Sequence, residues 1–259
     1  MNRSERSAPA HRPPRLFVRA GRLHPDSDPP RVNLDQDAIH YLRHVLRLGQ
    51  GAKLLLFDGS GQEYLAEVTE SRPTRVELKI LSTTRPEVES PLRITLAQAL
   101  LKGNAFDRVL TDATELGAHA IVPILCARTV PQSKGREAEA KVRRWEKILE
   151  AAAAQSGRVL VPRIEYPMLL ADFLSRRNEG LKLVLWENGP QAEGLPEDAS
   201  AEATLLVGPE GGFQEDEVQA AQAQGFRVWS LGPRILRADT AGPAALAILQ
   251  DRFGDGRKA

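Results

Sequence analysis

Residues 206–213, LVGPEGGF, and residues 231–241, LGPRILRADTA, carry the clearest architectural signals in this chain. In each stretch a short apolar run ends in a Gly-Pro pair, and a segment with helical spacing of apolar residues follows. Glycine lets the backbone approach a ligand closely, and proline fixes the path of the loop. Two such junctions in consecutive strand–helix units predict a ligand site beyond the carboxyl ends of parallel strands.

The two loops lack the spacing of known phosphate-binding fingerprints. Neither reads GxGxxG or GxxxxGK[ST], so a dinucleotide or nucleoside triphosphate is not the expected ligand. Backbone N–H and C=O groups at glycine-rich loops suit a nucleoside-like ligand, and ordinary turn chemistry is the alternative for either loop taken alone.

Around these loops, strand-like and helical segments alternate from residue 92 onward. The strands are expected at residues 92–99, 120–125, 181–186, 204–207 and 228–231. The helices are expected at residues 105–116, 137–154, 168–177, 215–224 and 240–253. This alternation predicts an α/β fold with a buried parallel sheet, and general topology rules alone would make it an ordinary doubly wound sheet.

The first third of the chain is rich in short β-like segments. They lie at residues 15–19, 31–34, 53–57, 63–70 and 74–81, with turns at 58–61 and 71–73. Asp35 is placed to cap one helix that runs to about residue 46. The pattern predicts a small β-rich barrel or sheet.

A domain boundary is expected in residues 83–91, TTRPEVESP, which have two prolines and no apolar periodicity. The expected organisation is a first domain at 15–82, a linker at 83–91 and a second domain at 92–259.

Composition limits the class of protein. The 259 residues are 42% hydrophobic and 27% charged, as in folded globular chains. The single cysteine, Cys126, excludes a disulfide framework and a CxxC zinc site. With no apolar run near 18 residues and no signal-peptide pattern, we expect a soluble protein of the cytoplasm, without membrane contact.

The net charge of +1 hides a basic N-terminal arm. Residues 1–25 hold six arginines and one acidic residue, Glu5. Such an arm can contact nucleic-acid phosphates, or it can be a solvated, solubilising tail. Charge does not decide between the two.

The two Gly-Pro loops resemble the cofactor loops of the SPOUT methyltransferases, and in particular of the RsmE family. The similarity extends to residues 40–51 (HYLRHVLRLGQG) and 55–68 (LLFDGSGQEYLAEV), which resemble the family's PUA-like RNA-binding domain. Residues 113–129 and 150–164, with Lys102 upstream, resemble segments of its catalytic domain. The resemblance covers residues 15–254.

The resemblance implies a C-terminal SPOUT-type parallel sheet tied in a trefoil knot and an N-terminal PUA-like β-barrel. It implies a homodimer that binds S-adenosylmethionine and methylates N3 of a specific uridine in 16S ribosomal RNA, within the small ribosomal subunit. The cofactor contacts are expected at Leu206, Val207, Gly208, Pro209, Glu210, Gly211, Leu231, Gly232, Pro233, Ile235, Leu236 and Ala238.

Methyl transfer to uridine N3 requires loss of the imide proton, so negative charge develops on the base. Arg234 and Arg237 are expected to stabilise this charge at the carbonyl oxygens, and Asp239 or Glu210 to accept the proton. The family usually reads LRTETA where residues 236–241 read LRADTA. Capping of the last helix is the alternative role for Asp239.

Arginines of the first domain are expected to bind RNA phosphates: Arg15, Arg19, Arg43 and Arg47. Arg43 and Arg47 are four residues apart and are predicted to share a helix face, and solvated surface charge is the alternative for each.

Other chemistry-bearing residues have plain structural interpretations. His40 and His44 have helical metal-ligand spacing, but without a glutamate between them or a third ligand no metal is expected. Cys126 is expected to be a small core residue, and the three tryptophans, Trp145, Trp186 and Trp229, are expected in the core.

Two other functions stay open from sequence. One is a related SPOUT methyltransferase with another RNA target. The other is a non-catalytic RNA-binding factor in ribosome assembly that has lost methyl transfer. This alternative stays open because Ala238 and Asp239 differ from the usual family sequence.

Overall fold

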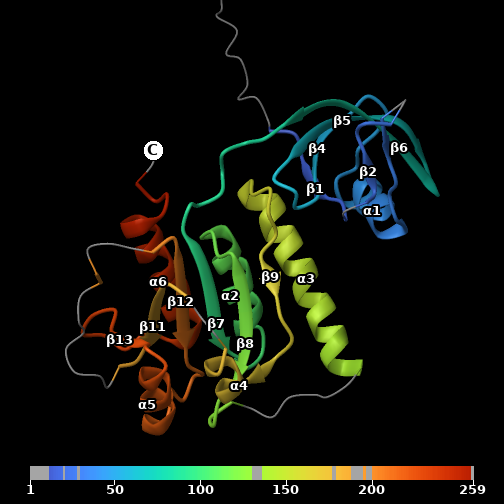
Figure 1. Cartoon of the computed structure of the whole chain (residues 1–259). Helices are drawn as coiled ribbons and strands as arrows, with labels where there is room; N and C mark the ends of the chain where they lie inside the picture. The colour runs from blue at the N-terminus through green and yellow to red at the C-terminus, as the bar shows by residue number, and fades with distance from the viewer. Residues whose placement is uncertain are drawn as a thin grey trace, which may run out of the picture. The chain divides into compact units, whose positions relative to one another are not determined.

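The computed structural model describes residues 12–19, 21–27, 30–129, 136–176, 179–187, 195–196 and 200–257. The chain divides into two compact units, Met1–Glu87 and Val88–Ala259 (Figure 1). Residues 1–11, which hold two of the six arginines of the expected basic arm, lie outside the described part of the chain.

The first unit is built on a four-stranded sheet. Its strands lie in the order β1 (Arg15–Phe17), β4 (Lys53–Phe57), β5 (Glu63–Arg72) and β6 (Arg75–Thr84). The pair β1–β4 is parallel and the other two pairs are antiparallel. A two-stranded antiparallel pair joins β2 (Leu23–His24) to β3 (Arg31–Val32). Alternate side chains of β5 and β6 are buried, as period-2 patterning predicts.

Two strand boundaries differ from the sequence-based expectation. The β5–β6 ladder continues to the pair Arg72↔Arg75, so the hairpin turn is shorter than the predicted 71–73. Strand β6 also continues to Thr84, three residues beyond the predicted end and into the segment expected to be a linker. Cross-strand hydrogen bonds extend both strands past the point where the apolar alternation stops.

The helix of the first unit begins and ends close to the predicted positions. Asp35 Oδ1 accepts a hydrogen bond from Ala38 N at 2.8 Å and caps α1 (Gln36–His40), which continues as the π-helical turn η1 (Tyr41–Val45). Arg47 then has a φ of 53°, in the left-handed region. The prediction that Arg43 and Arg47 share a helix face is therefore wrong, because the helix has ended before Arg47.

The second unit contains a parallel sheet with seven strands. Six of them follow the order β10 (Met168–Leu169), β8 (Ala120–Leu125), β7 (Arg93–Ala99), β12 (Glu202–Val207), β11 (Leu181–Leu185) and β13 (Arg227–Trp229). The seventh, β9 (Arg163–Ile164), also pairs with β8. Every pair is parallel, as the sequence predicted.

Strands β9 and β10 are too short to show a pattern in the sequence. The predicted helix 168–177 instead begins with β10, and only Leu170–Leu174 is helical, as α4. The apolar residues of that segment fit either element, which is the usual ambiguity of short apolar runs.

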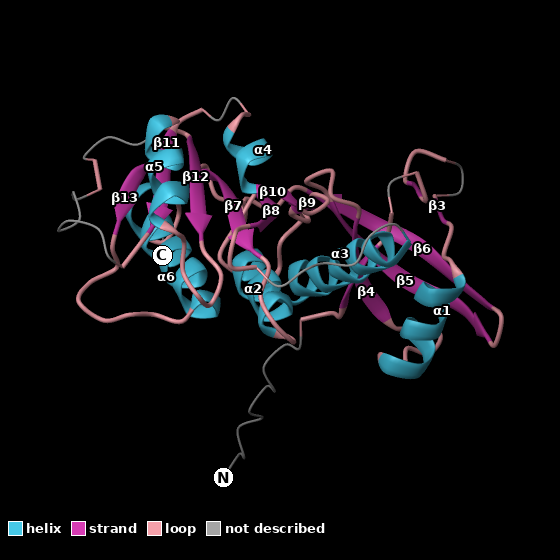
Figure 2. Cartoon of the chain, turned by 90° about the horizontal axis from the view of Figure 1, so that it is seen from below, coloured by secondary structure: helices cyan, strands magenta, loops and turns pink. Residues whose placement is uncertain are grey.

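Helices cover both faces of this sheet. The core on one face is formed with α2 (Ala105–Glu115), α3 (Arg136–Ser156) and α6 (Ala238–Phe253). The core on the other face is formed with α4 and α5 (Glu215–Ala223). Figure 2 shows α4 on the opposite side of the sheet from α2 and α6. The layers match the predicted α/β class, and the trefoil knot stays a prediction.

A buried ion pair joins distant parts of the second unit. Arg158 donates to Glu89 Oε2 at 2.7 and 3.0 Å and to the carbonyl oxygens of Thr114 and Ala118. Glu89 Oε1 accepts from Val159 N and Leu160 N, each at 3.0 Å. Glu89 lies within the expected linker, so part of that segment is packed into the second unit.

Among the described residues, the helices are too short or too polar to cross a membrane.

Candidate active site

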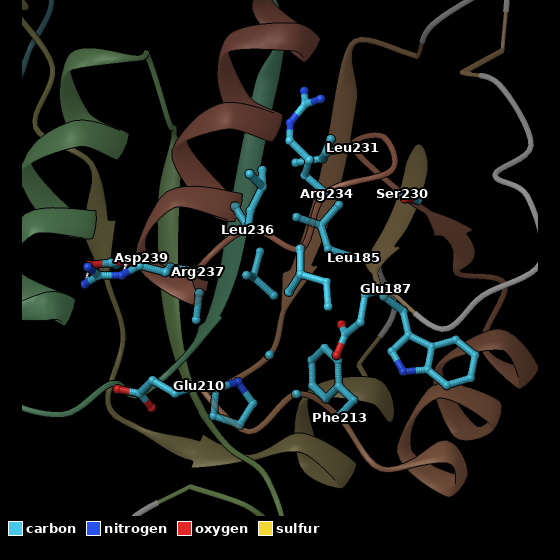
Figure 3. A pocket seen from close by; sticks show the side chains of 18 of the residues that line it. Leu185, Glu187, Glu210, Phe213, Ser230, Leu231, Arg234, Leu236, Arg237 and Asp239 are labelled. Atoms are coloured by element: carbon cyan, nitrogen blue, oxygen red, sulfur yellow. Dashed lines mark hydrogen bonds and ion pairs between the residues drawn. The ribbon is translucent and has the colours of Figure 1, made fainter.

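A cavity of about 750 Å³ lies at the carboxyl ends of three neighbouring strands of the parallel sheet (Figure 3). The loops that follow β12 and β13 line it, as the two Gly-Pro junctions predicted. The end of β11 supplies a third wall with Leu185, Trp186 and Glu187. This wall was not predicted from the sequence, although a Gly-Pro pair, Gly189-Pro190, also follows this strand.

Most of the residues expected to contact a cofactor line this cavity. They are Val207, Gly208, Pro209, Glu210, Leu231, Gly232, Pro233, Ile235, Leu236 and Ala238. Leu206 is fully buried in the core on the α5 side of the sheet. Gly211 lies against Arg128, whose Nη1 donates to the Gly211 carbonyl oxygen at 2.6 Å. Leu206 and Gly211 therefore do not line the cavity, and they pack against other parts of the protein.

Glycine is favoured at two points of the first loop. A Cβ atom on Gly208 would lie 3.1 Å from the Phe213 ring. Gly212 has a φ of +69°, and a Cβ there would lie 3.0 Å from Glu187 Oε1. A side chain at either position would crowd Phe213 or Glu187, and at Gly212 the positive φ adds backbone strain.

Contacts from neighbouring loops hold the first loop in place. Glu210 Oε1 accepts a hydrogen bond from Lys102 N at 2.8 Å, after β7. Glu217 accepts from Ala127 N and from Gln214 N, each at 2.8 Å. Gln214 is the N-cap residue of α5, and Glu217 satisfies its backbone donor as in a capping box. The loop is thus tied to the ends of β7 and β8.

Arg237 and Asp239 are in direct contact at the start of α6. Arg237 Nε donates to Asp239 Oδ1 at 3.0 Å, and Arg237 Nη2 donates to Oδ2 at 2.7 Å. Arg108 Nη2, from α2, donates to the same Oδ2. The Asp239 side chain is 8% exposed. The N-cap residue of α6 is Arg237, so the alternative that Asp239 caps this helix is wrong.

Arg234 lies apart from this pair. In Figure 3 its side chain extends away from Glu187 and Phe213, whereas that of Arg237 extends to Asp239. Arg234, Arg237 and Asp239 line the cavity, as do Glu187 and Phe213, whereas Arg108 does not. The wall therefore combines carboxylates with guanidinium groups and apolar side chains.

One buried donor at the cavity lacks a partner. Among the described residues, Trp186 Nε1 is shielded from solvent and makes no hydrogen bond. Trp186 is half-buried, whereas Trp145 and Trp229 are core residues as expected.

The predicted phosphate ligands of the first unit are placed differently from one another. Arg15 donates through Nε to Glu63 Oε1 at 2.8 Å and lies over the Phe57 ring, with 9% of its side chain exposed. Arg19 and Arg47 are exposed and Arg43 is half-buried. Arg15 therefore stabilises the β-sheet, and the exposed arginines keep the predicted role.

His40, His44 and Cys126 are the remaining chemistry-bearing residues that the sequence singled out. The rings of His40 and His44 pack 4.6 Å apart. Within the described residues no group of His, Cys, Asp and Glu has the arrangement of a metal site. Burial, with Glu217 nearby, raises the pKa of Cys126 to about 12, so its thiol stays protonated at neutral pH.

The fold and the cavity define a parallel α/β domain that binds a ligand across the carboxyl ends of its strands. Residues 88–250 match an RNA methyltransferase domain, and residues 34–81 match an RNA methyltransferase PUA domain.

Named relatives cover nearly the whole chain. Ribosomal RNA small subunit methyltransferase E of Synechocystis sp. is 36% identical, over 83% of this chain and 71% of its own length. The Bacillus subtilis protein of the same name is 31% identical, over 85% and 90%. The chain therefore belongs to the family of ribosomal RNA small subunit methyltransferase E.

A solved structure agrees with this assignment. Ribosomal RNA small subunit methyltransferase E from Neisseria gonorrhoeae, bound to S-adenosyl methionine, is 33% identical to this chain. The match covers 94% of this chain and 99% of that one, with a TM-score of 0.84.

Proposed function

We propose that this protein transfers a methyl group from S-adenosylmethionine to N3 of one uridine in 16S ribosomal RNA. The observation that carries the proposal is the cavity at the strand ends, where both Gly-Pro loops meet in a member of a ribosomal RNA methyltransferase family. The PUA domain supports an RNA substrate.

The residues of the cavity fit S-adenosylmethionine. Its volume of about 750 Å³ is in the range of small-molecule sites. The loops at 208–213 and 231–238 offer backbone groups and apolar walls to a nucleoside. The carboxylate of Glu187, which lines the cavity, suits the positive charge of the sulfonium or ammonium group. When bound, the cofactor supplies an electrophilic methyl group.

The side chains at the mouth of the cavity fit the needs of the uridine. Loss of the N3 proton leaves negative charge on the two carbonyl oxygens that flank N3. Arg237, fixed by Asp239 and 75% exposed, is placed to stabilise one of these oxygens. Arg234 would serve the other oxygen or a neighbouring phosphate. Holding the base against the methyl group supplies much of the remaining acceleration.

Glu210 is the better candidate for a proton acceptor. Its Oε1 accepts from Lys102 N, and the side chain is exposed at the cavity. Asp239 has two guanidinium partners instead.

We further propose that the enzyme is a homodimer acting on the small ribosomal subunit in the cytoplasm. Ile235 is 81% exposed on the cavity loop, and a second subunit covering this loop would remove that apolar surface from water. Sedimentation of wild type and Ile235→Asp tests the dimer: the variant should dissociate at higher concentration than wild type.

Nucleoside mass spectrometry tests the proposed reaction. Purified protein and methyl-labelled S-adenosylmethionine are incubated with unmodified small subunits, and in parallel with naked 16S RNA. Labelled 3-methyluridine at one position supports the proposal, and the more active of the two RNAs is the substrate. Label in another nucleoside would instead indicate a related methyltransferase. Cofactor binding without any label would overturn the proposal in favour of a non-catalytic RNA-binding factor.

A further inference from the structure

We propose that Arg108 is a positioning residue that holds Arg237 at the cavity through Asp239, and that Asp239 does not accept the substrate proton. This inference rests on the proposed methyl transfer. It goes beyond it by assigning a role to a residue outside both cofactor loops.

The three side chains form one bonded cluster from two helices. Arg108 lies on α2, and Arg237 and Asp239 lie at the start of α6. Asp239 Oδ2 accepts from both Arg108 and Arg237, and Oδ1 accepts from Arg237 Nε at 3.0 Å. The carboxylate is nearly buried between guanidinium groups that are 61% and 75% exposed.

Arg237 needs an external anchor to be held in one place. Its backbone is extended, at the junction where the cavity loop enters α6. A long, exposed side chain at such a junction has many rotamers, and ordering it costs entropy. Asp239 is in the first turn of α6, two residues after Arg237, and Arg108 projects from a different helix, α2, which packs in the core with α3 and α6. Arg108 therefore links the loop to a rigid part of the fold.

Arg108 acts at a distance from the substrate. Arg237, Asp239 and Ala105 line the cavity, and Arg108 does not. Among the described residues, its guanidinium group donates to the Asp239 carboxylate, which lies between it and Arg237. Removal of Arg108 should therefore change how well Arg237 is placed, without removing a contact to the cofactor.

The same contacts argue against Asp239 as a base. Each oxygen of its carboxylate already accepts a charge-assisted hydrogen bond. Protonation of Asp239 would weaken these bonds just as Arg237 must stabilise charge on the base. The proton lost from N3 then goes to Glu210 or to solvent water.

A second pair in the same unit provides a matched control. Arg144, 57% exposed on α3, pairs with Asp107, which is 17% exposed on α2. Neither residue lines the cavity. Arg144→Gln thus removes the same kind of ion pair from the surface beside α2 and leaves the site intact.

Single-turnover kinetics on small subunits test the inference. We expect Arg108→Gln to lower the transfer rate about 10-fold to 100-fold, with the Kd for S-adenosylmethionine changed less than about threefold. Arg144→Gln should match wild type. Asp239→Asn should be similarly slow, with an unchanged pH–rate profile, and the double variant should be no slower than Asp239→Asn. A wild-type rate in Arg108→Gln, or a pH limb lost only in Asp239→Asn, would overturn it.

A proton–nitrogen NMR correlation spectrum of the arginine Nε–H groups gives a readout that needs no substrate. Arg237 Nε–H, assigned with Arg237→Lys, should give a sharp signal in wild type and in Arg144→Gln, and a broadened, faster-exchanging one in Arg108→Gln. An unchanged signal in Arg108→Gln refutes the positioning role. If wild type methylates no uridine, the proposed function fails, yet this spectrum still decides the inference.

Discussion

Replacement of Glu89 by alanine should destabilise the second unit by about 3–5 kcal/mol. The substitution leaves the Arg158 guanidinium group, whose side chain is 8% exposed, without its counter-ion. It also removes the acceptor of Val159 N and Leu160 N. Breaking one side of a buried ion pair costs this much because the remaining charge stays desolvated.

The size of the effect follows from the bonds that are lost. Two charge-assisted hydrogen bonds from Arg158 and two backbone hydrogen bonds end on the Glu89 carboxylate. Glu89 is itself 21% exposed, so water can replace some of the lost hydrogen bonds. The expected cost is therefore near the lower end of the range of about 3–5 kcal/mol. Glu89→Gln retains one acceptor oxygen and should cost less than alanine.

Urea unfolding followed by tryptophan fluorescence measures this effect in the second unit. All three tryptophans, Trp145, Trp186 and Trp229, lie there, so the signal reports that unit. The control is Glu165→Gln, which breaks the exposed pair with Arg176 and should cost less than about 1 kcal/mol. If Glu89→Ala unfolds at the same urea concentration as Glu165→Gln, the argument from burial is refuted.

Three further predictions concern single side chains. Burial, with Arg93 next in effect, lowers the pKa of His119, so unfolding takes up a proton. Stability should therefore fall as the pH drops below about 6.5, and His119→Gln should flatten this slope in melting curves from pH 5 to 8. Cys126, with a pKa of about 12, should react with iodoacetamide at pH 8 at least about 100-fold more slowly than free cysteine, and rapid labelling of the native protein in mass spectrometry would contradict this. Gly212→Ala should destabilise the second unit by about 1–2 kcal/mol because φ is +69°, and an unchanged urea midpoint would contradict this.

Local patterns predicted most of the elements of this fold. The apolar run 120–125 is strand β8 with the same bounds, and Asp35 caps α1 as expected. These predictions hold because alternation, helical spacing and capping act within a few residues. They fail at strands β9 and β10, which are stabilised by pairing with β8 rather than by a pattern of their own.

Some parts of the candidate site were predicted from the sequence and one part was not. The two Gly-Pro loops were visible in the sequence, because glycine and proline mark a sharp turn wherever they occur. The cofactor followed from resemblance to a family, since backbone contacts leave no pattern of side chains. The wall at Trp186 and Glu187 was missed, because nothing in residues 181–187 indicates which strands become neighbours.

Sequence alone was enough for the parallel α/β class, the β-rich first unit and the two loops that line the cavity, since each depends on neighbouring residues. Tertiary structure decided which charges meet. Arg108 and Asp239 are 131 residues apart, and Glu89 and Arg158 are 69 apart. Such pairs form where helix packing and strand order bring two surfaces together. The sequence around a charged residue does not indicate which distant residue will be its partner in the fold.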